Sequence, residues 1–252
     1  LVSHFYNQTS YLIDRKNLRD VDNFNLNPFT NNDEDLVGMN LNFRNSLFFN
    51  RGKQHHSTTF TYLTNESKNL LSVGSITAFN QSHQFQYQHL IQKSWLINLF
   101  GNTTKTNATS ENYLSRNYEI KSYQIAPKIG YLFSKNASWD VFYEFQNKEN
   151  QIGALETLVQ SRLGTSFTLN SMKGFSMNGE FSYYKNTFTG NILAPVAFQM
   201  LEGLQPGKNQ TWRLLLQKNL TDYLDVNVNY QGRNSETSKT IHTGNIQLRA
   251  FF

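Results

Sequence analysis

Few side chains in this sequence have the type and spacing that catalysis needs. His55 stands two residues before Ser57, a spacing that a Ser–His pair could use, but the rest of a hydrolase motif is missing. Cysteine is absent, which excludes thiolate nucleophiles and thiolate metal sites. The His, Asp and Glu residues form no compact metal-binding cluster, and the sequence contains no glycine-rich phosphate loop. We therefore predict no enzyme activity, no metal and no cofactor.

The charged residues that could act together stand singly, on the polar positions of segments in which apolar and polar residues alternate. They have both signs: Arg44, Lys128, Asp140, Glu144, Arg162, Glu180, Arg213, Asp225 and Arg249. Across a common lumen they could form a field for a permeating solute, or they could form salt bridges with one another. Neither sign forms a ladder, so the sequence indicates neither anion nor cation selectivity. The net charge of +5 comes from scattered Lys and Arg, which argues against a nucleic-acid surface.

The period of two that places these charges extends along most of the chain. It is clearest over residues 37–49, 139–146, 159–170, 175–183 and 224–231, where most alternate residues are apolar. We predict less regular strands over 57–64, 70–80, 83–92, 94–102, 118–134, 209–220 and 239–252. This gives about twelve strands within residues 36–252. Residues 1–35 are predicted as an N-terminal segment with one possible strand and a polar loop over 15–35.

The composition is unusual for a soluble domain. Only 16% of residues are charged, against roughly 25% in a typical soluble domain, yet 14% are aromatic. The many aromatic residues exclude disorder, and no apolar run reaches the roughly 18 residues of a membrane-spanning helix. Strands with one apolar and one polar face explain the low mean hydropathy, because it averages residues that face lipid with residues that face water.

The connectors alternate in length, which is a second signal. Short turns are predicted at 134–138, 171–174 and 220–223, and longer loops at 101–117, 147–156, 186–208 and 232–239. Transmembrane barrels have short periplasmic turns and longer extracellular loops. The predicted strands are also longer than the roughly 5–6 residues usual in globular sheets. We therefore predict an all-β, transmembrane, antiparallel up-and-down β-barrel of about 12–14 strands in preference to a soluble sandwich, lying in the bacterial outer membrane with a periplasmic C-terminus.

Aromatic residues near strand ends fit the boundary between lipid and water. Trp95, Trp139 and Tyr223 each follow a short turn, and Trp212 follows the longest loop. In the last strand Ile246, Leu248, Ala250 and Phe252 share one face. This arrangement resembles the terminal-strand signal that the outer-membrane assembly machinery reads in bacterial barrels, although Gln247 stands where that signal usually has Gly. The resemblance implies that this machinery, outer-membrane lipid and lipopolysaccharide are partners.

A second resemblance covers residues 195–252. The run Ala197-Phe198-Gln199-Met200-Leu201-Glu202-Gly203-Leu204-Gln205-Pro206-Gly207-Lys208-Asn209, then Trp212, then Tyr230-Gln231-Gly232-Arg233-Asn234-Ser235-Glu236, resembles the C-terminal end of large, mostly uncharacterised outer-membrane proteins of Bacteroidota. This implies a barrel, an outer-membrane location and a longer parent protein, but no activity. The chain opens at Leu1 without Met or a signal peptide, so we expect it to be processed or part of a longer polypeptide.

The loop over 186–208 is unusually apolar for a segment in water, and its apolar residues are Ile192, Leu193, Pro195, Val196, Phe198, Met200 and Leu201. It folds into the lumen or over its mouth as a constriction, or docks a protein partner at the extracellular side, or forms an internal structural turn. The sequence favours a pore or transporter, or the C-terminal part of one. The alternative is a structural or accessory barrel in a secretion, assembly or surface-attachment complex.

Overall fold

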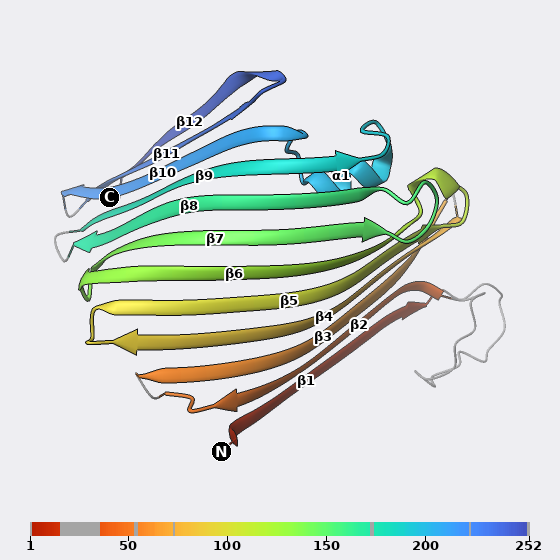
Figure 1. The fold of residues 1–252 in the computed structure, drawn as a ribbon, viewed down its shortest axis with the longest axis horizontal. Coiled ribbons are helices and arrows are strands. Elements are labelled where there is room, and N and C mark those ends of the chain that lie inside the picture. The colour runs from red at the N-terminus through yellow and green to blue at the C-terminus, as the bar shows by residue number, and fades with distance from the viewer. Residues whose placement is uncertain are drawn as a thin grey trace.

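The fold is one antiparallel sheet. The computed structural model describes residues 2–15, 36–52, 55–72, 74–171, 174–221 and 223–250. Within them twelve strands pair in chain order, each with the strand before it (Figure 1). The strands are β1 (Val2–Arg15), β2 (Leu36–Phe49), β3 (His56–Leu71), β4 (Gly74–Ile91), β5 (Trp95–Ser110), β6 (Tyr118–Ser134), β7 (Ala137–Asn150), β8 (Thr157–Ser171), β9 (Phe175–Thr189), β10 (Gly207–Thr221), β11 (Leu224–Ser235) and β12 (Ser238–Ala250). The prediction of an all-β, up-and-down antiparallel fold is confirmed.

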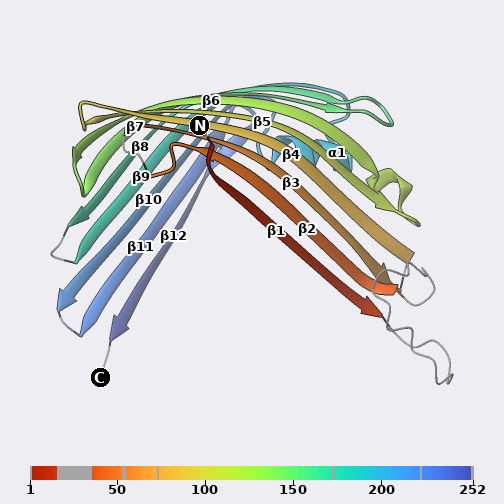
Figure 2. The same cartoon turned by 90° about the horizontal axis from the view of Figure 1, so that it is seen from below.

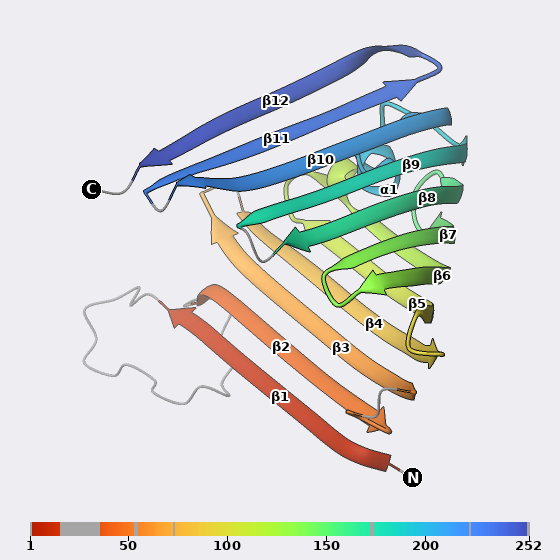
Figure 3. The same cartoon turned by 90° about the vertical axis from the view of Figure 1, so that its left-hand side faces the viewer.

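The sheet curves into a barrel-like trough with a convex and a concave face (Figure 2). Its two edges, β1 and β12, lie apart (Figure 3), and in the part of the chain that the structure describes each pairs along one side only. Two short helices interrupt the meander: a 3-10 helix, η1 (Leu114–Arg116), and α1 (Pro195–Leu201), which lies on the concave side. No helix among the described residues is long and apolar enough to cross a membrane.

The connectors differ between the two ends of the sheet. One end carries short turns such as 92–94 and 135–136, and the other carries the longer connectors 111–117, 151–156 and 190–206. The predicted loop over 232–239 is wrong, because the β11–β12 ladder continues to Ser235 opposite Ser238 and leaves a two-residue turn. The predicted loop over 101–117 is also too long, since β5 extends to Ser110.

Two of the predicted strands, 70–80 and 83–92, are a single strand. β4 passes through the polar run Asn80–Ser82 without a break, because Gln81 is paired with Thr64 on one side and Lys105 on the other. The described residues after position 35 therefore form one strand fewer than the prediction gave, and β1 brings the described total to twelve. The first strand in the N-terminal segment is real, while residues 16–35 lie outside the described part of the chain.

The strand register assigns every second residue to one face, since directly opposite residues in a sheet point to the same side. Two rows on the convex face are mainly apolar: Ile91, Trp95, Tyr131, Trp139 and Phe167 across β4–β8, and Phe5, Leu47, Phe60, Phe85, Gly101, Ile125 and Phe145 across β1–β7. Many convex side chains are open to the surroundings, among them Phe60, Ile125, Ile129, Leu163 and Leu248. The apolar residues of this sheet thus lie largely outside any core.

The buried apolar cluster is small and lies on the concave face beneath α1. It consists of Ile120 and Leu158 from the sheet and Val196, Met200 and Leu201 from the helix, with Tyr118 and Phe188 packed beside it. The remainder of the concave face is largely polar, although Leu63, Phe100 and Phe142 also lie on it. A row of amides crosses it from β4 to β9: Gln84, Asn102, Gln124, Gln146, Gln160 and Asn186.

Candidate functional site

The register places all nine of the charged residues singled out in the sequence on the concave face. Glu144 lies opposite Arg162, Glu180 opposite Arg213, and Asp225 opposite Arg249, while Lys128 lies opposite Phe142 and Asp140 opposite Ser166. Arg44 stands apart from the others on β2, opposite Leu63. The structure therefore brings together the charges of β6–β10 and leaves Arg44 isolated from them.

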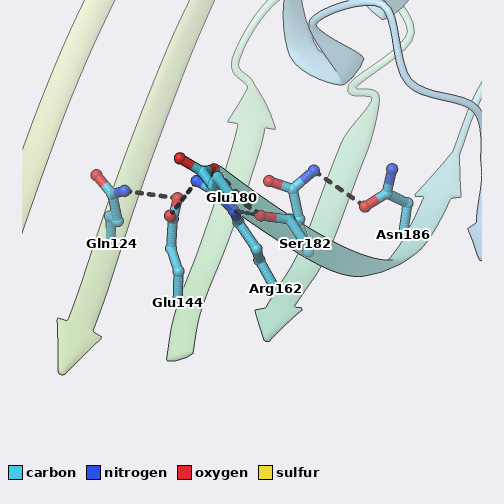
Figure 4. Close-up of polar contacts among 7 residues, drawn as sticks. Gln124, Glu144, Arg162, Glu180, Ser182 and Asn186 are labelled. Carbon is cyan, nitrogen blue, oxygen red and sulfur yellow. Dashed lines mark hydrogen bonds and ion pairs between the residues drawn. The ribbon is translucent and has the colours of Figure 1, made fainter. Parts of the chain in front are cut away.

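Arg162 is the centre of a polar network (Figure 4). Its guanidinium contacts Glu144 at 3.3 Å and Glu180 at 2.5 Å, and its Nε donates to Ser182 Oγ at 3.1 Å. Gln124 donates to the second oxygen of Glu144 at 2.6 Å, which ties β6 to the same network. The guanidinium also lies 4.7 Å from the centre of the Phe142 ring, close enough for a cation–π interaction. Arg162 thus pairs with two carboxylates of this chain and links β8 to both β7 and β9.

A second ion pair stands beside this network. Lys128 Nζ lies 3.0 Å from Asp140 Oδ2, and Ser166 Oγ donates to the same carboxylate at 3.4 Å. The Asp140 side chain folds over Gly130, where an added Cβ would come within 2.2 Å of Oδ1. The missing side chain at Gly130 therefore leaves space for the Asp140 carboxylate in the position where it pairs with Lys128.

The connector over 190–206 folds inward onto the concave face. Pro195 occupies the first turn of α1, where its missing N–H costs nothing, and Glu202 ends the helix in the left-handed conformation with its N–H bonded to Phe198 O. Val196, Met200 and Leu201 are buried, whereas Ile192, Leu193, Pro195 and Phe198 are exposed. The structure places this connector on the concave side of the sheet, at the long-connector end, which is the position that the alternative of a constriction requires.

Polar side chains that the sequence analysis did not single out bind this connector to the concave face of the sheet. Lys148 on β7 has only 7% of its side chain exposed; it donates to Met200 O at 2.9 Å and pairs with Glu202. Asn186 on β9 and Asn209 on β10 both donate to Gln205 O, at 3.0 and 2.7 Å. Lys148 has the same strand parity as Asp140 and Glu144, so the alternation alone could have placed it on this face. Its partner could not be predicted, because the connector has no period.

A polar pocket of about 490 Å³ lies between the wall and the end of this connector. Glu144, Gln146, Gln160, Arg162, Tyr184 and Arg233 line its wall, and Glu202, Gly203 and Leu204 form its cover. The pocket offers donors and acceptors of both signs and little apolar surface. Such a lining is suited to holding water or a polar solute and provides no nucleophile–base pair for catalysis.

The four aromatic residues placed at an interface by the sequence are partly or largely exposed. Trp95 and Trp139 lie in one convex row near the short turns, and Tyr223 stands in the turn before β11 with 70% of its surface exposed. Trp212 lies nearer the other end, with its indole over Gly232, where an added Cβ would approach within 2.4 Å. On the last strand Ile246, Leu248 and Ala250 share the convex face; Phe252 lies outside the described residues.

The residues first considered for catalysis are not assembled. Ser57 lies on the concave face opposite Gln88. His55 precedes β3, where its backbone carbonyl accepts a hydrogen bond from Leu90 N–H at 2.8 Å, and among the described residues no hydrogen bond joins its side chain to Ser57. Over the described ranges no group of three or more His, Cys, Asp or Glu side chains is arranged to hold a metal ion.

At the long-connector end of the sheet, the carboxylate of Glu111 is held by hydrogen bonds. Glu111 Oε2 accepts bonds from the Ser75 backbone N–H at 3.0 Å and from the Ser75 hydroxyl at 3.2 Å. These bonds favour the ionised form and lower the pKa of Glu111. The contact joins the β5–β6 connector to the start of β4 and so stiffens the rim.

Comparison with known proteins gives only a loose likeness. No protein-family model matches the sequence, and no curated protein matches it. Among solved structures, the β domain of the Bordetella autotransporter BrkA aligns with a TM-score of 0.39 and 8% identity over 85% of this chain and 91% of that one. The translocator domain of the autotransporter NalP from Neisseria meningitidis aligns with a TM-score of 0.37 and 9% identity over 85% and 82%. A correspondence this loose assigns no function.

Proposed function

We propose that this chain is an integral outer-membrane β-barrel protein in which the convex face contacts lipid and the concave face lines an aqueous passage. The observation that carries the proposal is that the twelve-stranded sheet gathers exposed apolar side chains on its convex face and a row of amides with a charged network on its concave face. An exposed apolar surface of this extent is unstable in water and stable in hydrocarbon.

The height of the apolar band fits a bilayer. On β6 the convex side is apolar from Tyr123 to Phe133, ten residues apart. At about 3.3 Å per residue and a tilt of roughly 40°, this run spans about 25 Å along the membrane normal, which is the height of the band in outer-membrane barrels. The convex Lys105–Glu119 ion pair lies beyond the long-connector end of this run, in the headgroup and water layer.

The proposed passage is lined by the amide row and the charged network, and it is narrowed by the inward connector at the long-connector end. Because a polar wall solvates ions and polar solutes, transport is the function that this arrangement supports best. We place the long connectors outside the cell and the short turns and C-terminus in the periplasm, as in other barrels. Lipopolysaccharide and the barrel assembly machinery are then its partners at the surface and during insertion.

The proposal is tested by reconstituting the purified protein in liposomes. Brominated lipids should quench the fluorescence of Trp95 and Trp139, and planar bilayers should show discrete conductance steps. A protein that remains in the aqueous phase would contradict membrane insertion. An inserted protein without conductance at any voltage would contradict an open passage and leave the lipid contact intact.

The resemblance to Bacteroidota proteins leads us to propose further that the twelve strands belong to a larger outer-membrane protein. The unpaired sides of β1 and β12 support this, because open strand edges are not stable in hydrocarbon and must be paired by other strands. Mass spectrometry of the protein isolated from its native membrane would give the length of the mature chain; a mature chain confined to this sheet would contradict the proposal.

An accessory role in a surface complex is the second candidate. It is favoured by exposed apolar side chains on three neighbouring connectors: Leu114, Leu155, Leu193 and Phe198, of which Leu193 is 78% exposed. Purification in mild detergent should then yield a stoichiometric partner that is lost when Leu193 and Phe198 are replaced by Ser. A lone monomer in both cases would rule out this role.

A further inference from the structure

We propose that the concave face of β10 and β11 carries an oxyanion-binding subsite built on Arg213 and Arg233. The subsite deepens the proposed transport function, on which its biological use rests, by naming the solute class as one with a carboxylate or phosphate group. The site is a pocket of about 440 Å³, whose lining includes both arginines, Thr211, Gln231, Thr243 and Glu180.

The register brings the two arginines together. Arg213 lies opposite Gln231 and Thr211 lies opposite Arg233, so the arginines are diagonal neighbours on adjacent strands. Such neighbours lie roughly 7–8 Å apart, with their Cβ atoms somewhat closer, a spacing at which two guanidinium groups can hold one oxyanion between them. Thr243 on β12 lies opposite Gln231 and adds a hydroxyl donor on the other side.

These arginines differ from the other central cations of the face in having no carboxylate in contact. Lys128, Lys148 and Arg162 each touch at least one carboxylate. In the described part of the chain Arg233 makes one long hydrogen bond to Gly203 O, at 3.4 Å, and Arg213 makes no ion pair. Their donors are therefore available to a ligand.

Glu180 is the acidic group that faces the pocket, and it is already neutralised. Its Oε1 lies 2.5 Å from Arg162 Nη2 and accepts a hydrogen bond from Ser182 at 3.3 Å. The pocket therefore has two cationic groups against one carboxylate that is shared with a third. The surplus positive charge selects an anion, and the planar forks of two arginines match an oxyanion better than a halide.

The pocket is larger than an inorganic ion needs. A volume of about 440 Å³ leaves room for the body of a small solute that carries the oxyanion, and the neutral donors Thr211, Gln231 and Thr243 are suited to its hydroxyl groups. Both arginines are exposed on the open face, so binding should be weak and sensitive to salt.

The test is calorimetric titration of the protein in detergent at low ionic strength, with inorganic phosphate and citrate as separate probes and glucose as the neutral control. We expect both anions to bind and glucose not to bind; stronger binding of one anion identifies the group that the site prefers. R213Q and R233Q should each weaken binding about tenfold. R44Q is the matched control, because Arg44 lies on the same face far from the pocket, and it should bind like the wild type.

Two outcomes would overturn the subsite. The first is that the wild type binds neither anion. The second is that R44Q, R213Q and R233Q weaken binding equally, which would mean that anions are attracted only by the overall positive charge of the face. Circular dichroism shows whether each variant is folded before titration. Conductance is measured separately, so the proposals can fail independently. A protein that conducts without binding anions retains the passage and loses the subsite, and one that binds anions without conducting does the reverse.

Discussion

Replacing Lys148 by Met should loosen the inward connector without unfolding the sheet. Lys148 is the buried cation that joins β7 to the end of α1, through Met200 O and Glu202. Methionine keeps an unbranched side chain that is one atom shorter, and it removes the charge and all three donors. The apolar contacts of Val196, Met200 and Leu201 remain, so the connector should still dock.

The magnitude follows from the two contacts. A hydrogen bond from a charged donor to the buried Met200 carbonyl is worth roughly 1.5–3 kcal/mol. The share of Glu202 is small, since 69% of its side chain is exposed and the solvent screens the pair. A loss of about 2 kcal/mol corresponds to roughly a 30-fold larger undocked population.

The assay is hydrogen exchange of the peptide that covers residues 195–206, whose amides at Glu202 and Leu204 bond to Phe198 O and Leu201 O. In Lys148→Met this peptide should exchange about 30-fold faster while peptides from β6 and β8 stay protected. Lys185→Met is the matched control, because Lys185 is exposed on the convex face. Unchanged exchange in Lys148→Met would refute the tether, and faster exchange throughout the sheet would refute its local character.

Two further predictions concern the wall and the rim. Gly164→Ala should lower stability by about 1–3 kcal/mol in denaturant titration, because an added Cβ would lie 2.3 Å from the Phe142 ring. Gly101→Ala, where the nearest atom is 4.0 Å away, should be nearly neutral, and equal losses would contradict the contact. The lowered pKa of Glu111 means that its bond to Ser75 N–H contributes fully above the carboxyl's ordinary pKa and is lost only as the pH falls through the lowered value. Amide chemical shifts of Ser75 should therefore titrate at a more acidic pH than those of a free glutamate, and Glu111→Gln should abolish that titration.

The sheet could be predicted because its signal is local. A period of two assigns a face to each residue, so Asp140, Glu144 and Arg162 could be grouped before any contact was known. The same signal fails where the alternation is weak: the polar run at Asn80–Ser82 looked like a break, and the ladders on both sides of β4 override it.

The contacts between strands and connectors could not be predicted from the sequence. The connector over 190–206 was visibly apolar, but its inward position depends on Lys148 and Asn186, which are distant in sequence. Likewise the sequence does not show that Arg213 and Arg233 contact no carboxylate, because this depends on Glu180 pairing with Arg162 instead. Parity gives the face of a residue, and only the three-dimensional register gives its partners.

The central claim, that the convex face meets lipid and the concave face meets water, is tested most directly by single-cysteine labelling in proteoliposomes. The chain has no cysteine, so each introduced thiol is the sole target. Ala126 and Ser166 on the concave face, replaced singly by Cys, should react with a water-soluble maleimide. Cysteines at Ile125, Ile129 and Leu163 on the convex face should stay unreacted until detergent is added. Equal labelling of the two faces, or protection of the concave one, would contradict the claim.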